Sequence, residues 1–167
     1  MGTHQQLNLN INHIGMSVHN LDQAIQWYST VLGFRLLRCV TRSRAETPKS
    51  PIFTMYGPIM QKAKVAFMAA GNSIGFELFE FVDPDFEEPR RSFEEGAFTR
   101  GGLFHFAITV PDVGALAAKA VENGGRKICD PVKMGAGEQA LHIADPWGNV
   151  IECMSCSFEL LVGRQSR

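Results

Sequence analysis

An internal repeat constrains the fold of this 167-residue chain more than any other feature. The first copy begins with His13 in the segment HIGMSV, and the second begins with His105 in the segment HFAITV. In each copy a run with helical spacing follows, and a strand-like segment that contains a glutamate closes the copy. A strand–helix–strands unit therefore occurs twice, at about 9–82 and 102–157, which predicts a pseudo-twofold core inside one domain of residues 1–167.

The expected helices have clear ends in both copies. Asn20 is a suitable N-cap for the first helix, and Gly33 is a suitable residue for its end. In the second copy Asp112 is the expected cap, and Gly124 follows the apolar stripe. The sequence therefore predicts one amphipathic helix directly after each of the two capping residues.

The strands of both copies alternate between apolar residues and polar or small residues. This period of two places His13 and His105 on the strand face that is turned away from the helix. The closing strands contribute Glu77 and Glu152. If the two copies pair around a pseudo-twofold axis, these two histidines and two glutamates converge on the concave side of one sheet.

Two imidazoles and two carboxylates together suit a divalent first-row metal ion, and Zn, Ni, Co, Fe and Mn all remain open. Taken singly, each histidine is more often a hydrogen-bonded core residue, and each glutamate an ion-paired one. An unpartnered buried carboxylate is costly, so the coincidence of both residue types at equivalent repeat positions favours a shared cation. We therefore predict four metal ligands, namely His13, Glu77, His105 and Glu152.

The chain resembles the vicinal oxygen chelate superfamily, which includes glyoxalases, bleomycin-binding proteins and extradiol dioxygenases, over about residues 11–157. The resemblance implies an α+β fold in which two paired βαβββ modules form a cupped mixed sheet around a metal site. It also assigns the family's ligand positions to the same four residues. The motifs that carry it are INHIG at 11–15, WY…LGF at 27–34, FELF at 76–79 and DPWGNVIE at 145–152.

The resemblance implies several chemistries, of which a glyoxalase-like lyase or isomerase is our first hypothesis. Ser17 and Phe81 stand where glyoxalase I contacts glutathione, which disfavours glyoxalase I itself. We expect a small carbonyl or hydroxy-acid-like substrate that reacts through a metal-bound enolate. Glu77 is the expected mobile ligand and base, Glu152 the fixed ligand, and His142 either a general acid or base or a solvent-bonded rim residue.

Two other functions stay open. An extradiol-type dioxygenase would use His13, His105 and Glu152 as a two-histidine, one-carboxylate iron site. Against it, His142 replaces the tyrosine of that family's closing motif, and Glu77 would occupy a further iron position. The third hypothesis is a metal-free module that binds a small molecule, although such modules typically lose the ligands that this chain retains.

Apolar side chains near the predicted ligands are candidates for contact with the substrate. The segment 43–62 is longer than a hairpin needs, so we expect either a lid or a contact between copies of the chain. The segment 83–100 is the expected linker between the repeats. The candidate substrate contacts are Phe67, Phe79, Phe81 and Met154.

Composition excludes several other classes of protein. Lysine and arginine number 16 against 17 acidic residues, which gives a net charge of −1 and no basic surplus for nucleic acid. The sequence has neither an apolar run long enough for a membrane span nor a visible secretory signal. We therefore expect the protein to be cytoplasmic and its four cysteines to be reduced. We also expect it to act on a small molecule and to form a homodimer.

Overall fold

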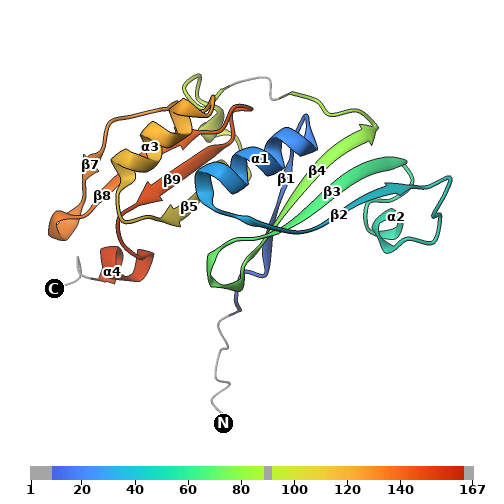
Figure 1. Ribbon diagram of the computed structural model, residues 1–167, viewed down its shortest axis with the longest axis horizontal. Coiled ribbons are helices and arrows are strands. Elements are labelled where there is room, and N and C mark those ends of the chain that lie inside the picture. Colours follow the sequence, from blue (N-terminus) through green and yellow to red (C-terminus); the bar gives the residue numbers. More distant parts are fainter. Residues whose placement is uncertain (1–8, 89–91, 164–167) are drawn as a thin grey trace, which may run out of the picture. The chain divides into compact units, whose positions relative to one another are not determined.

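The computed structural model describes residues 9–88 and 92–163 (Figure 1). Its backbone divides into two compact units, Met1–Phe86 and Glu87–Arg167, which we call module 1 and module 2. Among the described residues, no helix combines the length and hydrophobicity that crossing a membrane requires.

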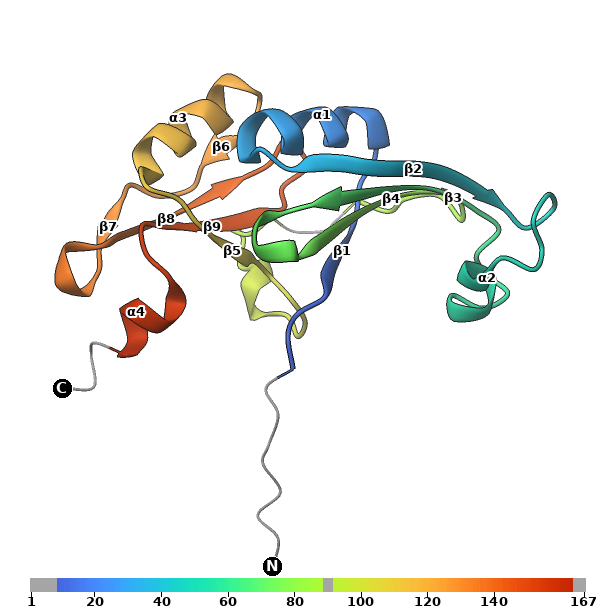
Figure 2. The ribbon, with the colours of Figure 1, turned by 60° about the horizontal axis from the view of Figure 1, so that its bottom comes forward.

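Module 1 is a four-stranded mixed sheet with the strand order β1-β4-β3-β2. The first and last strands, β1 and β4, pair in parallel, and the other neighbours are antiparallel. Figure 2 shows α1 on one face of this sheet and α2 on the other. Its elements are β1 (His13–Ser17), α1 (Leu21–Leu32), β2 (Arg35–Ser43), α2 (Pro51–Met55), β3 (Lys62–Ala69), a 3-10 turn (Gly71–Ser73) and β4 (Gly75–Asp83).

Module 2 repeats this topology, with the strand order β5-β9-β8-β6 and a short additional strand, β7, paired to β8. Strands β5 and β9 are again parallel, and β8 is antiparallel to its neighbours. Its elements are a 3-10 turn (Ala97–Thr99), β5 (Phe106–Thr109), α3 (Val113–Glu122), β6 (Arg126–Lys127), β7 (Val132–Lys133), a 3-10 turn (Gly135–Gly137), β8 (Gln139–Ala144), β9 (Val150–Met154) and α4 (Phe158–Gly163).

The structure confirms the α+β fold class, with a strand–helix–strands unit in each half of the chain. It also confirms the predicted helix caps. The Asn20 side chain accepts a hydrogen bond from the Gln23 amide at 3.0 Å, and Asp112 accepts one from the Ala115 amide at 2.9 Å. Gly33 ends α1 with φ of 72°, a left-handed conformation that glycine adopts without strain.

The helices bury their apolar faces, and in module 1 the α1 face meets aromatic residues. Tyr28 is fully buried, and its ring lies 4.9 Å from that of Phe76 in β4 and 6.1 Å from that of Phe34. In α3 the buried residues are small or branched, namely Val113, Ala117 and Ala120. The helix therefore covers one face of its sheet in each module, which leaves the opposite face for other side chains.

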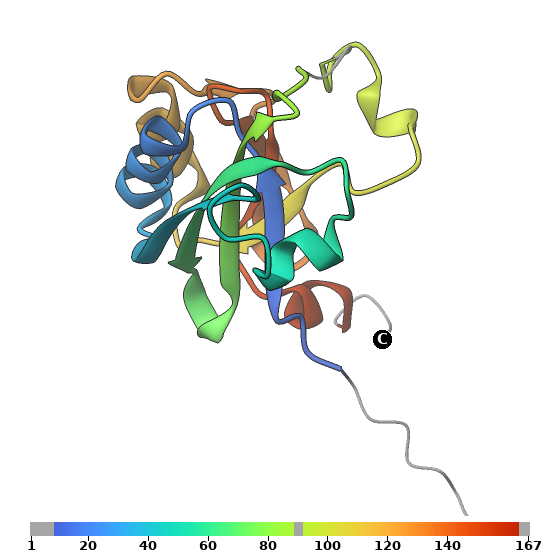
Figure 3. The same ribbon diagram turned by 90° about the vertical axis from the view of Figure 1, so that its right-hand side faces the viewer.

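The segment 43–62 differs from the irregular loop expected from the sequence, because it contains the short helix α2. Phe53 and Met60 are 3% and 2% exposed and pack with Ala63. Figure 3 shows α2 beside the strands of module 1, on the side away from α1. Buried apolar side chains thus give this segment a fixed conformation against the open face of the module 1 sheet.

The turn between β8 and β9 is organised by the buried carboxylate of Asp145, which is 1% exposed. The Asp145 side chain accepts hydrogen bonds from the amides of Trp147 at 3.0 Å and Asn149 at 2.8 Å, and from the Asn149 side-chain amide at 2.8 Å. A carboxylate that collects several N–H donors is a strong turn-forming group. Asp145 therefore fixes the register of the hairpin formed by β8 and β9.

We predict that Asp145→Ala lowers the free energy of unfolding by about 3 kcal/mol, because it leaves three partly buried N–H donors without their acceptor. Asp112→Ala, which removes an exposed helix cap, should cost only about 1 kcal/mol. Urea denaturation followed by circular dichroism measures both values. Equal losses in the two variants would contradict the central role of Asp145 in this hairpin.

Candidate functional site

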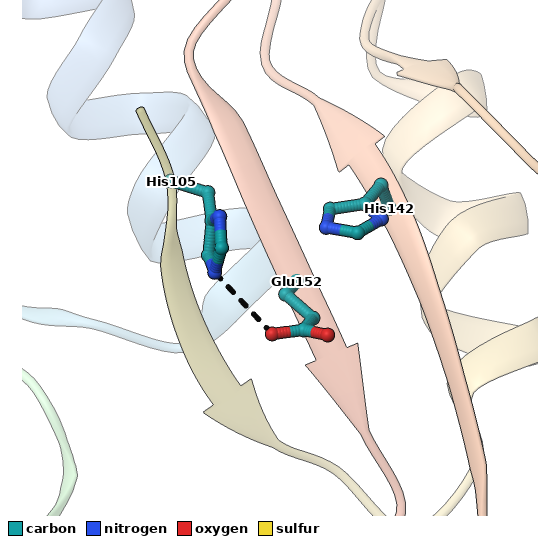
Figure 4. Close-up of side chains that lie close together, drawn as sticks. All are labelled: His105, His142 and Glu152. Atoms are coloured by element: carbon teal, nitrogen blue, oxygen red, sulfur yellow. Dashed lines mark ion pairs between the residues drawn. The ribbon is translucent and has the colours of Figure 1, made fainter. Parts of the chain in front are cut away.

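Three potential metal-binding side chains lie together on one face of the module 2 sheet (Figure 4). His105 directly precedes β5, His142 comes from β8, and Glu152 comes from β9 between them. His142 and Glu152 are direct cross-strand partners. The Nε2 atom of His105 lies 3.4 Å from Oε2 of Glu152, and one potential ligand atom from each of the three side chains lies within 4.8 Å of the others.

The surroundings of His142 favour its neutral imidazole. Burial is the main cause that lowers the pKa of His142 below its ordinary value of 6.5; nearby Glu152 opposes this shift and His105 adds to it. The Phe93 ring stacks on the His142 ring with centroids 5.6 Å apart. The next residue in the chain, Glu94, forms an ion pair with Arg126. A neutral imidazole has a free lone pair, which a metal ion requires.

His105 also carries an unsatisfied polar atom. Its Nδ1 is buried and has no hydrogen-bond partner among the described residues. Buried polar atoms are nearly always satisfied, so such an atom in this cluster indicates a missing partner such as water or another ligand. Together with the His-His-Glu donor chemistry, this atom fits a site for a divalent cation.

Module 1 repeats the histidine–glutamate pair at the same register. The His13 Nε2 atom lies 3.7 Å from Oε2 of Glu77, and Gly15 stands opposite Glu77 as Ala107 stands opposite Glu152. Asn12 Oδ1 lies 2.8 Å from Nδ1 of His13, a contact that can orient the ring.

A glycine is required beside His13. A Cβ atom at Gly75, the cross-strand partner of His13, would lie 2.9 Å from the Cβ atom of His13. Such a distance forces the backbone or the histidine to move. The absent side chain at Gly75 therefore leaves the space that His13 occupies.

The modules differ in the residue that stands opposite the glutamate on the neighbouring antiparallel strand. Phe67 in β3 stands opposite Glu77, whereas His142 in β8 stands opposite Glu152. Module 1 therefore offers one histidine beside its glutamate, and module 2 offers two. The convergence of His13, Glu77, His105 and Glu152 on one ion stays a prediction.

Sequence reasoning did not identify His142 as a potential metal ligand. The available clue was the cross-strand register, which follows from the alternation along the His142 strand and from the hairpin that the DPWG turn implies. Phe93 was also missed, because its segment was expected to be a linker and carries no motif.

The candidate substrate contacts lie in different surroundings. Phe79 and Phe81 follow Glu77 on the same strand face, and their rings stack with centroids 5.7 Å apart. Phe79 is buried, whereas Phe67 and Phe81 are half-buried. Met154 packs with Leu161 of α4, Ala140 and Cys156. Contact of these four candidate side chains with a substrate stays a prediction.

Comparison with known proteins identifies the family. Residues 10–153 match the model of the Glyoxalase/Bleomycin resistance protein/Dioxygenase superfamily. The chain belongs to this superfamily. A glyoxalase family protein from Bacillus cereus has the same fold, with a TM-score of 0.72 at 17% identity over 92% of this chain and 97% of that one.

Two curated relatives in this superfamily are enzymes of different kinds. The chain is 28% identical to a 2-epi-5-epi-valiolone epimerase from an Actinomyces species, over 87% of this chain and 78% of the relative. It is 27% identical to a catechol-2,3-dioxygenase from Bacillus subtilis, over 84% of this chain. The match covers only 40% of that dioxygenase. An enzymatic function is therefore plausible for the chain, and the relatives do not agree on one reaction.

We predict that His105→Ala and His142→Ala each weaken divalent metal binding at least about tenfold, because loss of even an outer partner of a metal ligand has an effect of this size. Metal content after purification without chelator, and zinc titration of the stripped protein, measure the loss. His13→Ala should act similarly if the four predicted ligands share one ion. His19→Ala, at an exposed histidine outside both clusters, is the matched control.

Circular dichroism should show that all four variants stay folded. Full metal occupancy in His105→Ala and His142→Ala would contradict the module 2 site. Full occupancy in His13→Ala alone would contradict the four-ligand hypothesis and leave the module 2 site standing.

Proposed function

We propose that the protein is a divalent-metal-dependent isomerase of the epimerase type that acts on a small carbonyl or hydroxy-acid-like compound. The observation that carries this proposal is the cluster of His105, His142 and Glu152 with its buried, unpartnered His105 Nδ1 atom. The epimerase relative, which aligns with most of both chains, favours an isomerase over a lyase.

We propose that His105, His142 and Glu152 hold the metal ion, with His13 and Glu77 as the further ligands that the sequence predicts. Zinc, nickel, cobalt, iron and manganese all accept such nitrogen and oxygen donors. When bound, the ion polarises a substrate carbonyl or hydroxyl oxygen and so makes the neighbouring C–H group more acidic. The remaining task for the protein is to take up and return the proton.

Glu77 is the proposed base. Its side chain is 23% exposed, so it is accessible to a substrate. Phe67 stands opposite it in the sheet, and Phe79 follows it on the same face. Glu77 is therefore a reachable carboxylate on a face lined by phenyl rings, and we propose that it accepts the proton from carbon.

Glu152 and His142 are proposed to keep a more fixed arrangement. His142 is the direct cross-strand partner of Glu152, and His105 lies on the other side of the same carboxylate. This position between two imidazoles supports the proposal that Glu152 is the permanent ligand. The role of general acid or base that the sequence suggested for His142 stays a prediction.

We predict that Glu77→Gln keeps most of the bound metal but loses at least about a hundredfold in proton exchange, because an amide cannot accept the proton. Glu152→Gln should instead lower metal content. Proton NMR measures the exchange as deuterium uptake from D2O at the carbon beside the carbonyl in a panel of small ketones and hydroxy acids. Glu122→Gln, on the exposed surface of α3, is the control.

Near-normal exchange in Glu77→Gln would show that another group is the base. Absence of exchange in the metal-loaded wild-type protein, across the whole panel, would contradict the isomerase proposal itself.

One observation favours a second candidate function. Two histidines and one carboxylate are the ligand set of non-haem iron oxygenases, and module 2 brings such a set together as His105, His142 and Glu152. The catechol dioxygenase relative supports this alternative, although the chain spans less than half of it. We nevertheless predict no oxygen consumption with catechols by the iron-loaded protein, measured with an oxygen electrode. Oxygen uptake matched by a ring-cleaved product would favour the dioxygenase over the isomerase.

We further propose that the protein works as a cytoplasmic homodimer. The four cysteines, all within the described residues, form no disulfide with one another, and this supports the proposal of a reducing compartment. Exposed apolar side chains on α4, such as Phe158 at 71% and Val162 at 47%, offer surface for a second copy. A metal-free binding module, the third sequence hypothesis, is less well supported because the potential metal ligands are present and clustered.

A further inference from the structure

The segment 50–60 of module 1 is held in place by one arginine. The Arg44 guanidinium donates hydrogen bonds to the carbonyl oxygens of Met60, at 3.0 Å from Nε and 2.9 Å from Nη2, and to those of Phe53 and Gly57. It also lies over the Phe53 ring, 4.7 Å from the ring centroid. These contacts bracket Tyr56 on both sides in the sequence, so Tyr56 is presented by a fixed segment of backbone.

Tyr56 lies over the aromatic residues that follow Glu77. Its ring centroid is 5.9 Å from that of Phe79 and 6.1 Å from that of Phe81. Phe79 follows Glu77 on the same strand face, so the Tyr56 ring lies on the side of the sheet that carries this carboxylate. In keeping with this position, burial and, second, the charge of Glu77 raise the pKa of Tyr56. Tyr56 therefore extends the surface around the proposed base.

The exposed part of this aromatic group belongs to Tyr56 rather than to Phe79. Phe79 is only 7% exposed, whereas Tyr56 is 42% exposed. The Tyr56 hydroxyl has no hydrogen-bond partner among the described residues. A half-exposed ring with a free donor, held beside a carboxylate, combines the apolar surface and the directed polar group that small-molecule sites use.

We propose that Tyr56 contacts the substrate and determines its specificity. Its ring selects carbonyl or hydroxy-acid compounds that carry an apolar ring, and its hydroxyl donates a hydrogen bond to a substrate oxygen beside Glu77. This inference rests on the proposed function, in which the Glu77 face receives the substrate. It assigns a specific contact to the segment that the sequence left open between a lid and a contact with a second copy.

The composition of the chain allows a direct test, because it contains only two tyrosines, Tyr28 and Tyr56. In zinc-loaded protein labelled with 3-fluorotyrosine, fluorine NMR should show one signal from each. Tyr28 lies on α1 and is fully buried against Phe76 of β4, so its signal is an internal control. The signal that disappears in Tyr56→Phe belongs to Tyr56, and the signal that remains belongs to Tyr28.

Mandelate and lactate are the probes, because they share the hydroxy-acid group and differ by a phenyl ring. We expect mandelate to shift the Tyr56 signal but not the Tyr28 signal, and to bind about tenfold more tightly than lactate. Tyr56→Ala should bring the two affinities to about the same value. Tyr56→Phe should keep the preference for mandelate and weaken both compounds about fivefold, because only the hydroxyl is lost.

A Tyr56 signal that moves with neither compound would overturn the inference, as would an unchanged preference in Tyr56→Ala. A Tyr56 signal that responds to protein dilution and to neither compound would show instead that a second copy covers this surface. Deuterium exchange in the same samples tests the proposed function separately. Exchange without any Tyr56 shift would contradict only the role of Tyr56, and a Tyr56 shift without exchange would contradict only the isomerase reaction.

Discussion

The parallel pairing of the first and last strand in each module is the constraint on which the candidate site depends. In module 1 this pairing brings His13 to Glu77, which lies 64 positions later in the chain (77 − 13). In module 2 the same pairing brings His105 to Glu152. Parallel neighbours need a crossover, which α1 and α3 begin and the antiparallel strands complete. The helix on one face and the histidine–glutamate pair on the other thus follow from one topology.

The two modules use this shared geometry differently. The residue opposite the glutamate is Phe67 in module 1 and His142 in module 2. An imidazole can share a cation or a proton with a carboxylate, and a phenyl ring cannot. The repeat therefore provides equivalent positions for the two glutamates, and the proposed division of roles between Glu77 and Glu152 rests on this single cross-strand difference.

Much of this could be predicted from the sequence, because the relevant patterns are local. The caps Asn20 and Asp112, and the strand faces of the four predicted ligands, depend on spacings of a few residues. His142 was placed on the correct face, but its part in the donor cluster depends on the hairpin register that Asp145 fixes. Tyr56 could not be predicted, because its position depends on how Arg44 folds the segment 50–60 back toward the sheet.

Histidine and glutamate side chains on the sheet faces opposite α1 and α3 are proposed to hold a metal ion, and the other proposals depend on this one. X-ray absorption spectroscopy of the cobalt-loaded protein tests it most directly, because imidazole rings give distinctive scattering beyond the ligand atoms. We expect imidazole nitrogen and carboxylate oxygen together around the cobalt, with the imidazole contribution reduced in His142→Phe, which installs the residue type that module 1 has at Phe67. A spectrum with oxygen ligands only, or one that is unchanged in both His105→Ala and His142→Phe, would contradict the account.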